Sequence, residues 1–241
     1  MVRIVHPIIT SAVGRALELF TLGKPTVPMP QLLPIRRSIL TVDKPVGEGQ
    51  PNQETDVLLV RLMLNLIAAT DAVWRDRFKT PMPHDRKFDA ELGRRVRAYQ
   101  QAGGFQMPVR GADDPPTPVV VTSFLRAGSA AGAGAALADA PAATVKEALF
   151  ADGVIDPCKP HTDRGSRSKL VYTVVHFNYH LLLRLRVQSL RLTPKLIRTI
   201  DDVVKDPKLA PLRSELEIAE RSDPDKPRPD PNPSPNPPVV I

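Results

Sequence analysis

Apolar residues recur at helical spacing just after residue 53. Their steps of three, four and three place them on one face of a helix. The residues of this stripe are Val57, Val60, Leu64 and Ile67. Asn52 can cap this helix, while Glu54 and Asp56 suit the positive end of its dipole. Since further apolar residues occupy its other sides, we expect the helix to be covered from several directions.

A second helix is predicted over about 88–101. Leu92, Val96 and Tyr99 make its inward stripe, and a pair of glycines ends it. A long apolar pattern over 170–190 predicts a third helix. Although this stretch is apolar enough to suggest a membrane span, histidines and arginines fall within the length that a span needs. We therefore expect a buried amphipathic helix and no membrane span.

Two more amphipathic helices are predicted further on, TPKLIRTIDDVVKD from residue 193 and PKLAPLRSELEIAER from residue 207. In the first of these, Thr193 is placed to cap and Pro194 fits the first helical position. The fold class that follows is mainly α.

The segments between the helices are extended or irregular. A short helix is expected over about 10–20, a short strand over 38–42 (SILTV), and one or two helical turns over 143–150 (ATVKEALF). Residues 105–143 contain a β-rich stretch, VVVTSFL, and a Gly/Ala-rich sequence that is typical of an insertion.

The expected organisation has four parts. They are an N-terminal arm with repeated prolines (1–45), a helical domain (46–165, with an insertion at about 105–143), a C-terminal helical segment (166–221) and a Pro-rich tail (222–241).

Charge narrows the classes of partner. Lys and Arg outnumber Asp and Glu by 33 to 26, a net charge of +7 that favours nucleic acid, anionic lipid or an acidic cell-wall polymer. Because the basic residues lie in short groups without interleaved aromatics, nucleic acid is disfavoured. The single Cys158 excludes an intrachain disulfide and a thiolate zinc cluster.

The first residues give an expectation about location. Pro7 and Arg15 interrupt the apolar run and no clear cleavage site follows, so no Sec signal is predicted. We expect a cytoplasmic, virion-associated or specially exported protein.

Three motifs in order resemble those of the peptidoglycan-binding domains of bacteria. That family has D-V-x-x-V-Q-x-L-L-N, then D-G-x-F-[DG]-x-x-T-x-x-A-[IV]-x-x-[FY]-Q, then D-G-x-[IV]-[DG]-P ending in a threonine. The matching segments are DVLLVRLMLN (56–65), DRKFDAELGRRVRAYQ (85–100) and DGVIDPCKPHT (152–162). The chain differs from the pattern at Arg61 (Gln in the family), Arg86 (Gly) and Leu92 (Thr), and by its insertion.

The resemblance implies a small helical bundle that binds peptidoglycan or another acidic wall polymer. Its Asp-Gly turns would lie beside helix N-termini, which suit the carboxylates of wall peptides. The candidate ligand-binding residues are Asp85, Asp89, Tyr99, Gln100, Asp152, Gly153, Asp156 and Thr162. For the aspartates and the glycine, capping and turn formation is the alternative role. Tyr99 and Gln100 could line a sugar groove, but an aromatic residue at helical spacing from Leu92 and Val96 favours the core for Tyr99.

Catalytic chemistry has little support in the sequence. His176 and His180 are four residues apart on one predicted helix, but HFNYH lacks the Glu of H-E-x-x-H, and only folding could supply His161 or Asp163 as a third metal ligand. Neither G-x-S-x-G, a P-loop nor G-x-G-x-x-G is present. We therefore expect no enzyme activity, no cofactor and no metal.

The leading hypothesis is a noncatalytic peptidoglycan-binding-like protein. The alternative is a structural or adaptor subunit of a phage tail or of a contractile, type VI-like injection apparatus, with protein partners bound through the arm and the tail. A cell-wall hydrolase that uses the two histidines is the third and least favoured hypothesis.

Overall fold

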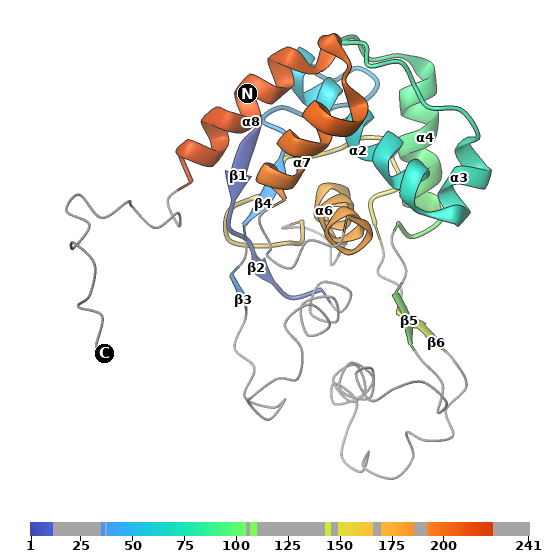
Figure 1. Cartoon of the computed structure of the whole chain (residues 1–241). Coiled ribbons are helices and arrows are strands. Elements are labelled where there is room, and N and C mark those ends of the chain that lie inside the picture. Colours follow the sequence, from blue (N-terminus) through green and yellow to red (C-terminus); the bar gives the residue numbers. More distant parts are fainter. Residues whose placement is uncertain are drawn as a thin grey trace, which may run out of the picture.

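The structure is a computed structural model and describes residues 1–11, 35–36, 38–104, 107–109, 143–145, 149–165, 170–185 and 192–223. It is mainly α-helical, as the sequence predicts (Figure 1). The α-helices of this part of the chain are α2 (Glu54–Thr70), α3 (Ala72–Phe78), α4 (Ala90–Gln101), α6 (Thr173–Arg184), α7 (Thr193–Thr199) and α8 (Ala210–Arg221). A π-helical turn (Ile200–Val204) and a 3-10 turn (Pro207–Leu209) join α7 to α8.

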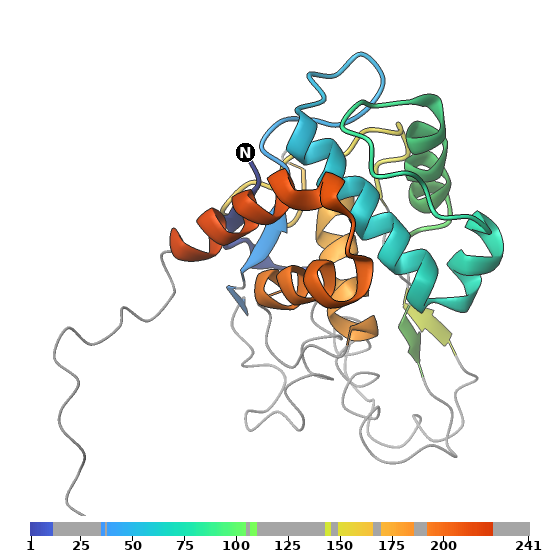
Figure 2. The ribbon, with the colours of Figure 1, turned by 45° about the horizontal axis from the view of Figure 1, so that its top comes forward.

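Helix α2 lies at the centre of the core and crosses the middle of the helical body in Figure 2. It contacts α3, α6 and α8, and its predicted apolar stripe is fully buried. Leu58, Leu59, Leu62 and Met63, which lie off that stripe, are buried as well. The prediction that this helix is covered from several directions is therefore confirmed.

The start of α2 differs from the prediction. Gln53 occupies the cap position without a side-chain cap bond, so the prediction that Asn52 caps the helix was wrong. Asn52 has φ 49° and turns its amide back, accepting a hydrogen bond from Gly47 N and donating to the carbonyls of Gly47 and Gln50. The amide closes the preceding turn because the backbone reverses there, bringing Gly47 within its reach.

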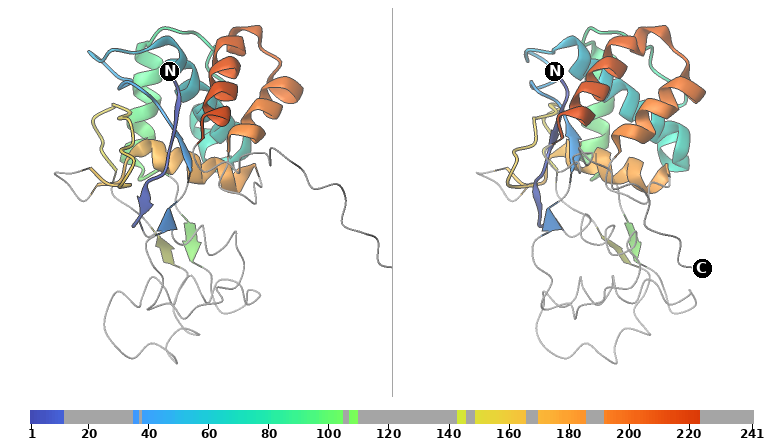
Figure 3. Two further views of the ribbon diagram at one scale, coloured as in Figure 1. Left: turned by 90° about the vertical axis from the view of Figure 1, so that its left-hand side faces the viewer. Right: turned by 60° about the vertical axis from the view of Figure 1, so that its left-hand side comes forward.

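The N-terminal residues pair with the segment before α2. Strand β1 (Arg3–Val5) pairs antiparallel with β4 (Ile39–Thr41), and β2 (Ile8–Ile9) pairs antiparallel with β3 (Ile35–Arg36). The register places Ile4 opposite Leu40. Strand β4 confirms the prediction of a strand over 38–42, and Figure 3 shows β1 beside α8, which it contacts.

Strands β5 (Met107–Val109) and β6 (Ala143–Val145) form a separate antiparallel pair. The prediction of helical turns over 143–150 was therefore wrong at its start. Pairing with β5 supplies inter-strand hydrogen bonds, and two of the three residues of β6 are β-branched, which favours extended backbone. Most of the helix expected over 10–20, the β-rich stretch at 119–125 and most of the Pro-rich tail lie outside the described residues.

Helix α6 is shorter than the predicted 170–190 and is buried at ten successive positions, from Thr173 to Leu182. Among the described residues, no single helix is long and apolar enough to cross a membrane. Only α2 and α3 together reach that length and composition, and they bend by 114° at their junction. In α7, Pro194 lies in the first turn as predicted, but Thr193 forms no side-chain cap bond because it is already inside the helix.

Candidate functional site

Two turns that lie far apart in the sequence are joined by one backbone bridge. Val46 N donates to Ile155 O (3.1 Å) and Ile155 N donates to Val46 O (2.8 Å). Next to this bridge, a Cβ on Gly47 would lie 2.9 Å from Val154 Cγ2 and 3.2 Å from Gly153 O. Glycine therefore permits the turn before α2 to lie against the Asp-Gly turn.

Gln100 attaches the Asp-Gly turn to α4. Its Oε1 accepts from Gly153 N (2.8 Å), and its Nε2 donates to Val154 O (2.9 Å) and to Thr173 Oγ1 (3.0 Å). Asp152 Oδ1 accepts from Val154 N (2.9 Å), and Gly153 has φ 82°, a conformation that favours glycine. Both predicted residues, Gln100 and Asp152, thus shape the turn.

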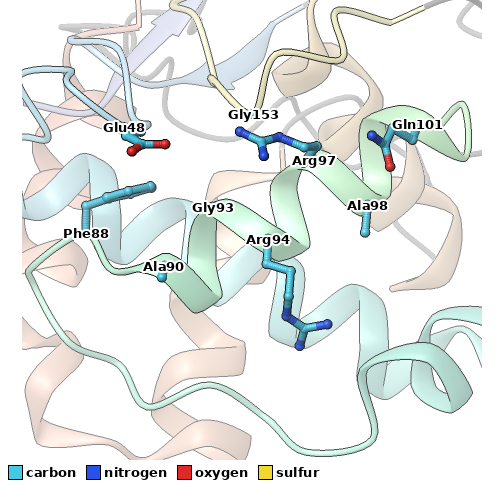
Figure 4. Close-up of a pocket in the computed structure, with 9 residues that line it drawn as sticks. All are labelled: Glu48, Phe88, Ala90, Gly93, Arg94, Arg97, Ala98, Gln101 and Gly153. Carbon is cyan, nitrogen blue, oxygen red and sulfur yellow. The ribbon is translucent and has the colours of Figure 1, made fainter.

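A surface groove of about 470 Å³ lies between α4 and these two turns. We call it the α4 groove, and Figure 4 shows its lining residues, which are Glu48, Phe88, Ala90, Gly93, Arg94, Arg97, Ala98, Gln101 and Gly153. A Cβ on Gly93 would lie 2.9 Å from Phe88 Cζ. The Phe88 ring therefore packs against the backbone of α4.

Two charged groups in the α4 groove have no partner in the described part of the chain. Arg97 is exposed, and its guanidinium lies against Gly153, where a Cβ would be 3.2 Å from Nη2 and 3.3 Å from Nε. Glu48 is exposed as well, and neither residue forms a hydrogen bond or ion pair with any described residue. Arg94 differs because it makes two 2.8 Å hydrogen bonds to Glu91, and Figure 4 shows it pointing away from Glu48.

The predicted residues Asp85 and Asp89 do not line the groove. Asp89 caps α4 through Leu92 N (2.8 Å) and pairs with the buried Arg61 (2.8 Å). Burial opposes ionisation of Asp89, but the hydrogen bonds from Arg61 and Leu92 N outweigh it and lower the pKa of this carboxyl group. Asp85 pairs at the surface with Lys208 (3.1 Å).

The structure places Tyr99 in the core. The side chain is fully buried, with ring centroids 4.8 Å from both Trp74 and Phe177, and its hydroxyl lies 3.1 Å from His180 Nδ1. Tyr99 and Gln100 are adjacent on a helix and therefore point in different directions. Tyr99 points toward α6, and Gln100 points toward the Asp-Gly turn. Neither side chain is exposed enough to contact a polymer.

Asp156 and Thr162, the last two predicted residues, also lie outside the groove lining. Burial and the nearby charge of Asp152 raise the pKa of Asp156. Thr162 Oγ1 accepts from Arg164 N (3.1 Å) and donates to Arg164 O (3.2 Å). Of the eight predicted residues, only Gly153 lines the α4 groove.

Sequence reasoning missed Glu48 and Phe88 as groove residues. Glu48 stands between two glycines of the first turn, which is the signal of an exposed side chain at a turn tip. Phe88 occupies the aromatic position of the second motif, and Gly93 five residues later leaves room for it. The spacing alone does not indicate that either residue faces Gly153.

His180 belongs to a buried hydrogen-bonded chain. Its Nε2 lies 3.1 Å from Asp71 Oδ2, and the other ring nitrogen faces the Tyr99 hydroxyl. Since an ionised carboxylate only accepts, Nε2 carries the proton and Nδ1 accepts from the tyrosine. The hydrogen bond from His180 lowers the pKa of Asp71, and burial lowers the pKa of His180 despite the carboxylate.

His176 lies outside the hydrogen-bonded chain that contains His180. It is fully buried, neither ring nitrogen has a hydrogen-bond partner among the described residues, and burial lowers its pKa to about 3. In the described ranges, no group of three or more His, Cys, Asp or Glu side chains is arranged to hold a metal ion. The two histidines contribute to the interior of the fold.

Comparisons of the chain with family models, curated proteins and solved structures gave no match. The resemblance to peptidoglycan-binding domains therefore rests on residues 56–65, 85–100 and 152–162 alone.

Proposed function

We propose that this chain is a noncatalytic binding protein that holds peptidoglycan, or another acidic cell-wall polymer, in the α4 groove. The observation that carries the proposal is the position of Arg97. Its guanidinium has no partner among the described residues, and it lies in a groove lined by residues of two of the segments that resemble the peptidoglycan-binding pattern, 85–100 and 152–162.

The chemistry of the groove suits a carboxylate ligand. A guanidinium presents paired N–H donors that match the two oxygens of a carboxylate, and wall peptides carry carboxylates. The apolar surface of Phe88 in the same groove can cover the uncharged part of a peptide or sugar. The net charge of +7 favours approach to an acidic polymer.

The proposal is tested by co-sedimentation of the full chain with purified peptidoglycan sacculi. We expect the chain to pellet, with added salt weakening the binding because surface charges are screened. Arg97→Ala should reduce the affinity about tenfold, which corresponds to the loss of one charge-assisted contact of roughly 1.4 kcal/mol.

Arg94→Ala is the matched control, since Arg94 lies on the same helix but is engaged by Glu91. It should change the affinity much less than Arg97→Ala. No pelleting of the full chain above a control protein would overturn the proposal, and equal effects of the two variants would place the binding surface elsewhere.

A second candidate function, an adaptor subunit of a phage tail or injection apparatus, is favoured by the β5–β6 pair. In Figure 1 this pair projects from the helical body, and within the described residues it bonds to no other strand. An isolated two-stranded ribbon offers unpaired backbone groups to which a partner can add a strand.

Co-expression with the products of neighbouring genes tests the adaptor function. Removal of residues 107–145 should then abolish a stable complex and leave the helical core folded, as judged by circular dichroism. A complex that forms equally well without the ribbon would exclude this mode of assembly.

A further inference from the structure

We infer that the α4 groove selects a zwitterionic peptide end, with the ligand carboxylate bound by Arg97 and a ligand ammonium group bound by Glu48. The inference rests on the proposed function and deepens it, because it states which part of a wall polymer the groove recognises.

The groove contains opposite charges that do not neutralise each other. Glu48 and Arg97 come from the first turn and from α4, they line the same groove, and no ion pair joins them. A purely anionic ligand would be attracted by Arg97 and repelled by Glu48. A ligand with both charges satisfies both groups.

The two charges are carried by a hydrogen-bonded turn and by a helix, which hold their backbone in place. The Asn52 amide closes the turn that carries Glu48, accepting one hydrogen bond from Gly47 N and donating two, to the carbonyls of Gly47 and Gln50. Arg97 extends from α4 along the Asp-Gly turn, where Gly153 leaves space for its guanidinium. Charges on rigid elements lose less conformational freedom when they bind a ligand.

The competing backbone donor at this turn is already engaged. Gly153 N would be the natural donor to an anion at this turn, but Gln100 Oε1 already accepts from it. Arg97 is thus left as the group that binds the carboxylate. The Phe88 ring, which lies beneath Glu48 in Figure 4, provides apolar surface for the carbon chain between the two ligand charges.

Calorimetric titration of the full chain with three forms of one wall peptide tests the inference. The probes are the soluble tripeptide alanyl-γ-glutamyl-diaminopimelate, the same peptide acetylated at its amines, and the same peptide amidated at its carboxylates. We expect the unmodified peptide to bind about tenfold or more tightly than either modified form, since each modification removes one charge contact.

Two variants test which protein side chain binds each charge of the ligand. Glu48→Gln should remove the discrimination against the acetylated peptide and keep that against the amidated one, and Arg97→Gln should do the reverse. Both side chains are exposed, so unchanged thermal unfolding is expected and serves as the folding control.

The outcomes separate this inference from the proposed function. If Glu48→Gln tightens binding to sacculi, or the acetylated peptide binds as well as the unmodified one, the groove binds anions only and the zwitterion inference is overturned while the proposed function stands. If the full chain binds neither sacculi nor any of the peptides, both are overturned.

Discussion

Arg61 connects α2 to the loop that precedes α4. Its side chain is completely buried, donates to Lys87 O (2.9 Å) and Pro83 O (3.3 Å), and pairs with Asp89. These acceptors compensate for the desolvation of the guanidinium. The residue therefore holds the loop before α4 against α2.

We predict that Arg61→Ala lowers the free energy of unfolding by about 3 kcal/mol, because it leaves a cavity and removes the donors to the two carbonyls. Urea denaturation measures this change. Arg86→Ala is the control, since its ion pair with Glu54 is exposed, and it should cost less than about 0.5 kcal/mol. Similar losses for both variants would contradict the structural role of Arg61.

His176 makes stability depend on pH. Its pKa is about 3 in the folded protein and 6.5 in the unfolded chain, so the unfolded state binds the proton more readily. The group therefore stabilises the fold fully above the unfolded pKa, and this contribution is lost as the pH falls from about 6.5 toward 3.

We predict that His176→Leu flattens the fall in stability between about pH 6 and pH 5 by roughly 1 kcal/mol, because one proton-binding difference is removed. Urea titrations at the two pH values measure it. His161→Asn, at an exposed histidine, should leave the wild-type slope unchanged. A wild-type slope retained in His176→Leu would show that His176 is not held neutral.

At the scale of elements, the Asp-Gly turn depends on one side chain of α4. Gln100 is buried and makes three hydrogen bonds that connect this helix to the turn and to α6. Within the described part of the chain, no such connection involves Gln101, which is exposed at the rim of the groove. Two adjacent glutamines thus have different roles because the helix directs them to different surroundings.

Gln100→Ala is expected to lower the free energy of unfolding by about 2–3 kcal/mol, since buried backbone groups lose their partners. Gln101→Ala should change it by less than about 0.5 kcal/mol. Hydrogen exchange gives a local measurement, because the Gly153 amide should exchange faster in Gln100→Ala. Unchanged protection of that amide would mean that the turn is held by other contacts.

At the scale of the whole molecule, α2 joins the N-terminal strands and the C-terminal helices in one core. Helix α8 contacts α2, α7 and β1, and α6 contacts both α2 and β4. Asn178 adds two hydrogen bonds between α6 and the backbone of Leu40. Helices α6 and α8, which follow residue 165, contact the same central helix as α3 does.

We therefore predict that residues 1–165 do not fold alone, because their separation from α6 and α8 would expose the apolar faces of α2. The fragment should bind a hydrophobic dye, whereas the full chain should unfold in one cooperative transition. The ring centroid of Trp74, the single tryptophan, lies 4.8 Å from that of Tyr99, so tryptophan fluorescence reports on the core. Coincident fluorescence and circular dichroism transitions are expected for the full chain, and a folded fragment would contradict the prediction.

Elements that depend on local pattern could be predicted from the order of the amino acids. The stripe from Val57 to Ile67 predicts α2, the stripe of Leu92, Val96 and Tyr99 predicts α4, and SILTV predicts β4. Gly153 was also identifiable, since an Asp-Gly sequence favours a turn with positive φ. Such features are predictable because neighbouring residues produce them.

Contacts between distant segments of the folded chain determine which polar groups satisfy one another and which remain for a ligand. Asn52 closes a turn and does not cap a helix, and Gln100 supports a distant turn. Glu48 and Arg97 are brought to one groove by the bridge between Val46 and Ile155. Periodicity reports which side of a helix is apolar, but the partner of a polar side chain depends on contacts between segments remote in sequence, which the fold alone establishes.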